Sequence, residues 1–444
     1  MLAVSCTLLL CVSALFKHSE TCTRLVQDEL LRKALHDRAH STGYAIREQW
    51  MFSPANAPRF SLTIDGFAHD FKVRAFTGEE AISKPYFFNV ECASERPDLD
   101  LQCLFDVPAF LAFDTWGNGI HGRIYHIARG PDAQGLTHYN LALVPHLSYL
   151  RHRINKRIYQ QFSVPAIVAL VLEEHGILGD AYRFELGASY PERDCCTQYD
   201  ETDLHFIQRL CEEEGIHFHF QHSAQGHVLV FGDQQAVFPA IGPTTAFAPG
   251  HDGLATLLPV GHGTPTSLRA RESRQVEGQG TQSGLLSGHV LETSGQGSDL
   301  WLLTQVIHEG KQPQVAGESV ANVNTDNQVQ LRQGYRNRFT ALALDLCYRP
   351  PLAHEKPLAP GNQTALVIAL EDQANSRGQR FERVKVKFPW DREGRFDDKS
   401  SCWLAGTANW RCEVTPLRPG VEVKVAFLEN DPDQPLISGC LCCG

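Results

Sequence analysis

Apolar and polar positions alternate in two stretches near the end of the chain, residues 383–388 and 421–427. A period of two predicts strands that bury one face, with Val384 pointing inward and Lys385 outward. An Asn-Asp-Pro-Asp sequence at 430–433 predicts a turn after the second stretch. Several short strands around one small core are typical of a compact barrel, most simply an OB-like barrel.

The same alternation begins upstream near Arg59. Residues 60–75 hold two alternating runs joined by Asp65-Gly66, which predicts a β-hairpin. Further strands are predicted at 85–92, 119–127, 139–145, 216–220, 288–291, 300–309 and 363–370. These strands indicate a β-barrel or a strongly curved sheet.

Two segments change to the helical period. Residues 163–176 have a Ser N-cap, a Pro in the first turn and a terminal Gly. Residues 200–215 place their apolar side chains on one helical face. Glu212–Glu214 stand at the C-terminal end of that helix, where the dipole disfavours negative charge, so a cation such as Arg209 is expected to compensate.

Four ordered blocks at the C-terminal end carry a family resemblance. They are Phe388–Gly394 (FPWDREG), Ser401–Trp403 (SCW), Pro419–Val423 (PGVEV) and Phe427–Pro435 (FLENDPDQP). Their order resembles the OB-fold domain of the type VI secretion spike family, VgrG (Rhs-element Vgr family). Weaker blocks extend the resemblance upstream to about Arg59, through a half that is similar to a phage baseplate hub.

The resemblance implies a mainly β, α+β fold: phage-hub-like β-barrel domains followed by a C-terminal OB-fold barrel. Tyr348–Gly361 holds several prolines that cannot donate ladder hydrogen bonds and therefore predicts an extended connector. The expected organisation is an unassigned N-terminal extension (1–58), a hub-like β-barrel domain (59–150), an α+β hub subdomain (151–235), a second hub-like β domain (236–347), a Pro-rich connector (348–362) and the OB-fold spike base (363–444).

The resemblance also implies a function. Three copies would form a trimeric hub that caps the hexameric tube of the secretion apparatus, with baseplate proteins, effectors or adaptor chaperones as further partners. The chain would be cytoplasmic before firing and secreted afterwards, with no enzymatic activity and no cofactor. Family members continue into a β-helical needle, whereas this sequence ends at Gly444, so we expect a monomer or weak oligomer in isolation.

The net charge and the cysteine content bear on whether the chain binds nucleic acid and on whether disulfide bonds hold the fold together. The formal net charge of −11 argues against a nucleic-acid groove, which needs a basic surface. The 14 cysteines are scattered and predict a reduced chain rather than a disulfide scaffold. The apolar run Leu2–Phe16 is too short for a membrane span; it fits a frayed helix or a targeting segment, and both interpretations stay open.

Several groups of residues are candidates for metal binding. His217, His219 and His222 could begin a metal site but lack evident further ligands, so half-buried strand histidines are the preferred interpretation. Cys440, Cys442 and Cys443 form a thiol-rich tail of unassigned role. His308-Glu309 lacks the second His of a zinc motif, because position 312 is Gln.

The sequence also gives only weak evidence for a catalytic site. Ser163, His175 and His205 form no recognisable triad. Glu212–Glu214 could supply paired carboxylates for glycoside hydrolysis, but consecutive helical positions splay apart, which favours a solvated face. We therefore predict no catalytic, cofactor-binding or metal-binding residues.

Two other functions stay open at this point. An OB-like barrel could bind oligosaccharide or nucleic acid through Trp390, Trp403 and Trp410, together with Lys385 and Lys387. A cell-wall hydrolase associated with a baseplate-like assembly is the other alternative. The first would show salt-sensitive binding, and the second would need a pocket with convergent polar groups.

Overall fold

The computed structural model describes most of the chain from residue 59 onward. The described residues are 59–68, 71–96, 99–133, 135–241, 258–259, 275–293, 299–312, 331, 333–374, 380–391, 401–405 and 418–441. The predicted N-terminal extension, with its run Leu2–Phe16, lies outside them. The chain divides into two compact units, each assembled from two separate segments. The first unit comprises residues 1–145 and 218–348, and the second comprises residues 146–217 and 349–444.

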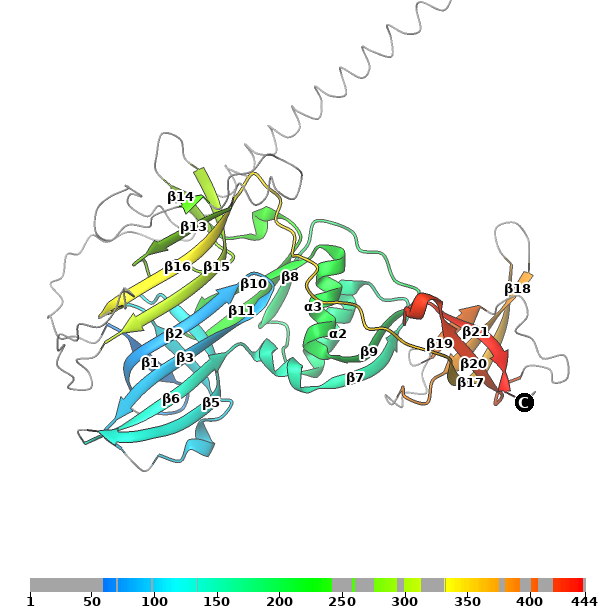
Figure 1. Cartoon of the computed structure of the whole chain (residues 1–444), viewed down its shortest axis with the longest axis horizontal. Coiled ribbons are helices and arrows are strands. Elements are labelled where there is room, and N and C mark those ends of the chain that lie inside the picture. The colour runs from blue at the N-terminus through cyan, green and yellow to red at the C-terminus, as the bar shows by residue number, and fades with distance from the viewer. Residues whose placement is uncertain are drawn as a thin grey trace, which may run out of the picture. The chain divides into compact units, whose positions relative to one another are not determined.

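One large sheet dominates the first unit (Figure 1). Its strands follow the order β1-β4-β5-β6-β3-β2-β15-β16-β13-β12, and β14 pairs with β15. The bounds are β1 Ser61–Ile64, β2 Lys72–Ala81, β3 Lys84–Ser94, β4 Pro108–Ala112, β5 Gly119–Ala133, β6 Leu136–Val144, β12 Leu258–Pro259, β13 Gln275–Gly280, β14 Val290–Thr293, β15 Asp299–Lys311 and β16 Gly334–Ala343. Outside that sheet, β10 (His217–Ser223) is hydrogen-bonded to β11 (Gly226–Gly232) in a three-stranded sheet.

The sheet joins segments that are far apart in sequence. β2 pairs antiparallel with β15, with Thr77 opposite Glu309. In the core of this unit, the rings of Phe76 and Phe113 stack 5.0 Å apart. The stretches 59–150 and 236–347, expected from the sequence as successive domains, therefore contribute to one sheet. The domain boundaries along the sequence stay a proposal.

The predicted hairpin at 60–75 is wrong. β1 pairs with β4, with Leu62 opposite Leu111, rather than with β2. The Asp65 backbone N–H donates to the Pro108 carbonyl at 2.9 Å and prolongs that pairing past the turn. The Asp65-Gly66 turn is present, but β1 pairs with β4 and not with the strand that follows the turn.

Glycines of this sheet stand opposite aromatic residues. Gly78 lies across from Phe88, Gly278 across from Phe339 and Gly310 across from Phe76. A Cβ atom added at Gly78 would lie 2.1 Å from the Phe88 ring. The missing side chain is what lets each ring lie over its neighbouring strand.

We expect Gly78→Ala to lower the free energy of unfolding by about 1–3 kcal/mol, because the Phe88 ring must leave its packed position. Gly226→Ala is the matched control, since nothing lies within 4 Å of its added Cβ. Chemical denaturation of both variants measures the difference. Equal stability of the two variants would contradict this account of the paired glycines.

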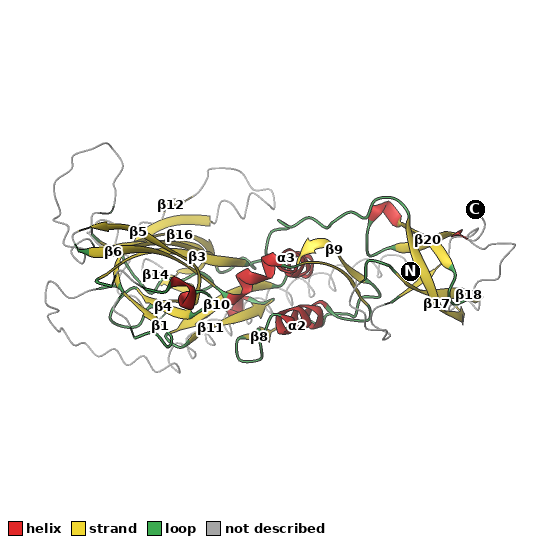
Figure 2. Ribbon diagram, turned by 90° about the horizontal axis from the view of Figure 1, so that it is seen from below, coloured by secondary structure: helices red, strands yellow, loops and turns green. Residues whose placement is uncertain are grey.

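The second unit contains both α-helices that the structure describes (Figure 2). Its first segment carries β7 (Ile154–Tyr159) paired antiparallel with β9 (Cys196–Thr202), together with η2 (His146–His152), α2 (Val164–Glu174), β8 (Tyr182–Glu185) and α3 (Asp203–Glu214). Its second segment begins with residues 349–362, which have no helix or strand, as predicted for the connector.

Both predicted helices are confirmed, beginning and ending close to the expected residues. Ser163 occupies the N-cap of α2, although its side chain makes no capping hydrogen bond. In α3 the Thr202 hydroxyl accepts the His205 N–H at 3.1 Å. Gly215 ends α3 in the left-handed region with φ of 72°, which a residue without Cβ adopts readily.

The chain ends in a five-stranded antiparallel sheet, which we call the terminal module. Its order is β19-β18-β17-β20-β21, with β17 Gln363–Ala374, β18 Arg380–Lys387, β19 Cys402–Ala405, β20 Glu422–Phe427 and β21 Pro435–Cys440. The alternation read from the sequence is confirmed, because Val384 and Val386 are fully buried, and so are Val423 and Val425. The OB-fold label for this module stays a prediction.

Lys385 is a correction to that alternation. It is only 6% exposed, although the sequence pattern places it outward. Its Nζ lies 5.6 Å from the centre of the Trp403 ring on the neighbouring strand. The outer side of β18 is therefore covered, and a buried ammonium is tolerated there because the aromatic face attracts it.

The cysteines and the helices bear on two further expectations. Of the described cysteines, Cys92, Cys103, Cys195, Cys196, Cys211 and Cys402 are free thiols. Cys440 is an exception, because it is disulfide-bonded. None of the described helices has the length and apolarity that a membrane span requires.

Candidate functional site

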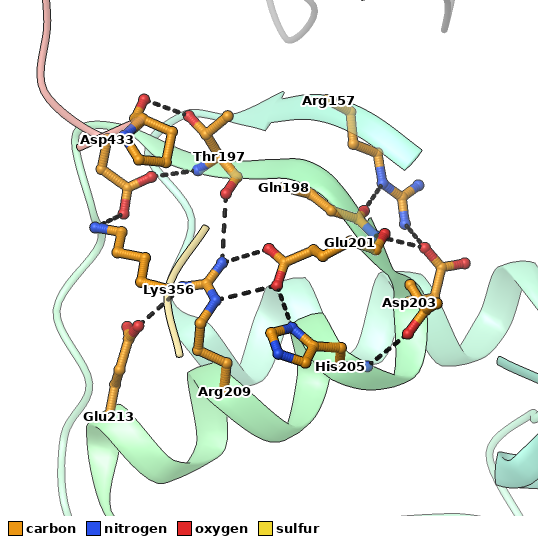
Figure 3. Close-up of polar contacts among 12 residues, drawn as sticks. Arg157, Thr197, Gln198, Glu201, Asp203, His205, Arg209, Glu213, Lys356 and Asp433 are labelled. Atoms are coloured by element: carbon orange, nitrogen blue, oxygen red, sulfur yellow. Dashed lines mark hydrogen bonds and ion pairs between the residues drawn. The ribbon is translucent and has the colours of Figure 1, made fainter. Parts of the chain in front are cut away.

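The charged residues of the second unit gather where β9 runs into α3 (Figure 3). Glu201 lies near the end of β9, and Asp203 is the first residue of α3. The N-terminus of a helix favours a carboxylate, because the first backbone N–H groups carry partial positive charge. The Thr202 cap fixes the turn between them, so the two carboxylates face different sets of partners.

The Asp203 carboxylate is fully buried and accepts hydrogen bonds from several side chains. The donors are Arg153 Nε, His175 Nε2 at 2.7 Å, Gln198 Nε2 at 2.8 Å, Asn155 Nδ2 at 3.0 Å and Arg157 Nη2 at 3.5 Å. Burial by itself raises the pKa of Asp203, but the hydrogen bonds and the arginine charges outweigh it and lower the pKa. Asp203 therefore stays ionised and ties α3 to β7 and α2.

Arg209 forms the second centre of this network and is 1% exposed. Its guanidinium donates to Glu201 Oε1 at 2.6 Å and Oε2 at 3.2 Å, and to Glu213 Oε1 at 2.8 Å. His205 Nδ1 lies 2.6 Å from Glu201 Oε2. Burial lowers the pKa of Arg209, but its bonds to Glu201 and Glu213 more than offset this and raise it. The charged groups satisfy one another, as buried charges require.

Lys356 and Thr197 extend the network to the terminal module (Figure 3). Lys356 Nζ lies 2.7 Å from Asp431 Oδ1 and 2.6 Å from Asp433 Oδ2. The Thr197 N–H donates to Asp433 Oδ1, and the Thr197 hydroxyl donates to the Pro432 carbonyl at 2.9 Å. The turn at 430–433 is thus fastened to β9 and to the connector.

The predicted solvated face at the end of α3 is wrong for Glu212, whereas Glu213 is exposed and Glu214 is half-buried. Glu212 is 7% exposed and accepts from the Ala353 and His354 backbone N–H groups at 2.8 and 2.9 Å. Glu213 and Glu214 both pair with Arg193. The expected compensation by Arg209 is present at Glu213, and Arg193 adds to it.

A cavity of about 530 Å³ opens beside this network, between the β9–α3 corner and residues 355–358. Glu201, His205 and Lys356 line it, but each is held in the ion pairs described above. A general base or a nucleophile needs a free lone pair and an aligned partner. The arrangement can hold two segments together.

The first unit contains a second polar cluster, which sequence reasoning missed. His308 Nδ1 lies 2.6 Å from the Tyr335 hydroxyl, and His308 Nε2 lies 3.2 Å from Glu80 Oε1. A hydroxyl, an imidazole and a carboxylate in line resemble a nucleophile with its base. All three side chains are at most 2% exposed, and the Phe113 ring stacks on His308, so no substrate reaches them.

His308 of this cluster and the adjacent Glu309 are the two residues that the sequence analysis considered as part of a zinc motif. Their side chains have different partners, because Glu309 pairs with Arg336 while His308 bonds to Glu80 and Tyr335. A sequence feature that could have indicated this buried polar cluster is a polar residue at an inward-facing position of an alternating strand. Glu80 follows that rule in β2, where it falls between apolar inward positions.

His217 and His219 of β10 are more deeply buried than expected, each 1% exposed, whereas His222 is half-buried as predicted. His222 Nδ1 accepts the His121 N–H at 3.2 Å, and His121 Nδ1 lies 3.1 Å from His227 Nδ1. Within the described residues, no group of three or more His, Cys, Asp or Glu side chains has the geometry of a metal site.

We expect the first unit to lose stability as the pH falls below about 6.5, the ordinary His value. Burial, together with neighbouring histidines, lowers the pKa of His222, and burial also lowers the pKa of His121 and His289. The unfolded chain then binds protons that the folded chain does not, so each histidine lowers stability by up to about 1.4 kcal/mol per pH unit.

Denaturation midpoints at pH 7.5 and pH 5.5 measure this effect. His222→Leu removes one such group, and its stability should depend less steeply on pH than that of the parent. Asp65 near His121 and Glu80 near His289 favour the protonated rings, but burial of the rings outweighs these charges. Equal slopes for parent and variant would refute the assignment to His222.

The remaining candidates do not converge. His175 bonds to Asp203 and His205 to Glu201, so no triad with Ser163 forms. Trp390 donates to Gln363 Oε1 at 2.7 Å and stacks on Phe388 at 4.8 Å, which places it in the packing of the terminal module. Trp410, Cys442 and Cys443 lie outside the described residues.

Comparison with known proteins gives this arrangement a context. The family model "Phage tail baseplate hub (GPD)" matches residues 79–261. The type VI secretion system spike protein VgrG4b of Pseudomonas aeruginosa is 46% identical, over 88% of this chain and 57% of its own length. VgrG5 of the same organism is 44% identical, over 88% of this chain and 58% of its own length.

This chain is a relative of the VgrG spike proteins. It spans somewhat more than half the length of those two relatives. The resemblance read from the four C-terminal blocks is thereby confirmed. A more distant VgrG relative, the actin cross-linking toxin VgrG1 of Vibrio cholerae, is 27% identical over 86% of this chain and 41% of its own length.

Two solved structures share the fold. The Escherichia coli c3393 protein, a type VI secretion component with structural similarity to the T4 phage tail proteins gp27 and gp5, has a TM-score of 0.68 at 23% identity, over 86% of this chain and 99% of that chain. A Francisella PdpA–VgrG complex has a TM-score of 0.58 at 7% identity, over 86% of this chain and 78% of that chain. The mainly β, hub-like fold class is confirmed.

Proposed function

We propose that this chain is a structural, non-enzymatic part of the spike at the tip of a type VI secretion apparatus. The observation that carries the proposal is the 46% identity to VgrG4b along 88% of the chain. Because the chain spans 57% of that relative, the functions of the remaining length are not attributed to it. The structural role concerns the hub and the terminal module.

The charged network of the second unit supports a load-bearing role. Arg209 and Asp203 hold α3 against β9 and β7, and Lys356 holds the connector against the turn at 430–433. Buried ion pairs resist displacement of one element past another, because separating them leaves unpaired charges in a poorly solvated place. Such fastening suits a part that passes thrust from one module to the next.

The partners follow from the proposed role. A homotrimer in the assembled apparatus would present its hub to the hexameric tube protein, with baseplate proteins and effectors or their adaptors as further partners. In the Francisella complex, a VgrG protein is bound to another protein, PdpA. The chain would be cytoplasmic before firing and leave the cell with the spike. The net charge of −11 disfavours a nucleic-acid partner.

The test is complementation in a host whose resident spike genes have been deleted. We expect the full chain to co-purify with the tube protein and to appear with it in the culture medium. Failure to bind the tube protein, with normal folding, would refute the proposal; salt-sensitive binding to an oligonucleotide would favour a binding module instead.

A further inference from the structure

Two free thiols of the second unit meet at the boundary between its two segments. Cys195 stands just before β9, and Cys402 is the first residue of β19. Their Sγ atoms lie 3.8 Å apart, although 207 positions separate them in sequence. A disulfide bond is about 2.05 Å long, so the two sulfur atoms are in van der Waals contact and need to move less than about 2 Å to bond.

The surroundings hold this pair in place. Cys402 is 1% exposed and belongs to the apolar core of the terminal module, against which Cys195 packs. Ile158 of β7 is part of the same core, so the β7–β9 segment and the terminal module share it. Thr197 Oγ1 lies 3.6 Å from the Cys195 sulfur. Cys195 is partly exposed and the residue before it, Asp194, is exposed, so a small oxidant reaches Cys195 first.

We propose that Cys195 and Cys402 form a redox-sensitive clasp that bonds the terminal module covalently to the β7–β9 segment in an oxidising environment. Both thiols are free in the structure, which corresponds to the reduced, open clasp. The bond would link residues that are 207 positions apart and so close a loop that includes residues 218–348 of the first unit. Long loops are the ones in which a cross-link most restricts the unfolded chain.

The oxidant is a small-molecule disulfide such as oxidised glutathione. The Cys195 thiol loses its proton to solvent, and its sulfur attacks one glutathione sulfur, so a mixed disulfide forms and one glutathione thiolate leaves. The Cys402 thiol then loses its proton, and its sulfur attacks the Cys195 sulfur, releasing the second glutathione thiolate. Two protein thiols are oxidised to one disulfide, and one glutathione disulfide is reduced to two thiols.

The rate should be slow at neutral pH. The hydrogen bond to Cys402, followed by burial, raises the pKa of Cys195, so little thiolate is present. The clasp therefore stays open in a compartment that keeps thiols reduced and closes during residence in an oxidising one. If the chain is exported as proposed above, closure would follow export, but the chemistry does not depend on that.

The test uses the full chain, incubated with oxidised glutathione at about pH 8, near the ordinary thiol pKa, and digested without reduction. We expect a cross-linked peptide containing Cys195 and Cys402, and a melting temperature of the second unit that rises by about 5–10 °C and falls back after reduction. Mixed disulfide at Cys195 without the cross-linked peptide, or two thiols that stay unmodified, would overturn the proposal.

Variants assign the bond. Cys195→Ser and Cys402→Ser should each abolish the cross-linked peptide and the reversible rise in melting temperature. Cys196→Ala is the neighbouring control, and Cys103→Ser, an exposed thiol of the first unit, is the remote control; both should retain the cross-link. Should a serine variant fail to fold, the peptide map of the parent chain decides, because Cys402 linked to Cys196 instead would contradict the assignment.

Discussion

Replacing Arg209 by Met is expected to lower the free energy of unfolding of the second unit by about 3–5 kcal/mol. Arg209 is fully buried and holds Glu201, which is itself 6% exposed, through two hydrogen bonds. Met fills a similar volume but leaves the Glu201 carboxylate with the His205 ring as its remaining side-chain hydrogen-bond partner. The loss would come from the unpaired charge rather than from a cavity.

A double substitution separates these two causes. Arg209→Met combined with Glu201→Leu removes both charges, and we expect it to recover most of the lost stability, since a buried pair is often no more stabilising than apolar residues of similar volume. Urea denaturation of the two single variants, the double variant and the parent measures the coupling. If the double variant were as unstable as the sum of the singles, the charge argument would be wrong.

Asp203→Ala should cost a similar amount, about 3–5 kcal/mol, because Arg157 is 3% exposed and loses one of its two carboxylate partners. The substitution also removes the oxygen atoms to which His175 and Asn155 donate, and one of the two acceptors of Gln198 Nε2. Asp180→Ala, at an exposed position, is the control and should change stability by less than about 0.5 kcal/mol.

The pH dependence of this effect has a defined sign. The folded pKa of Asp203 lies below its ordinary value of 3.8. Its contribution is therefore complete above that value and is lost as the pH falls through the folded pKa. The stability difference between the parent and Asp203→Ala should be largest near neutral pH and shrink below about pH 4. A difference that stayed constant down to about pH 2 would contradict an ionised Asp203.

Local rules predicted much of the second unit. The caps and apolar stripes of α2 and α3 depend on neighbours within four residues, so sequence spacing located both helices. The alternation in β18 and β20 likewise identified their buried faces. The alternation rule failed at Lys385, because the burial of this side chain depends on Trp403 in the neighbouring strand. The pattern of a single strand carries no information about such a neighbour.

The candidate site was only partly predictable. Arg209 was expected to compensate Glu212–Glu214, because helical spacing places residues 209 and 213 side by side. The other partners of those glutamates come from elsewhere: Arg193 lies in the loop before β9, and the backbone N–H groups that the buried Glu212 accepts belong to Ala353 and His354 of the connector. A solvated face was predicted because none of these is adjacent in sequence.

The sequence alone determined the family, the β-rich composition, the two helices and the turn at 430–433, because these depend on residue order and short-range periodicity. The tertiary structure decided which strands pair, how two distant segments build each unit, and which charges and thiols meet. The physical reason is distance along the chain. Local sequence patterns depend on near neighbours and do not distinguish among the many possible partners of a distant residue. Tertiary packing selects the partners, as in the pairs β2 with β15, Glu212 with His354 and Cys195 with Cys402.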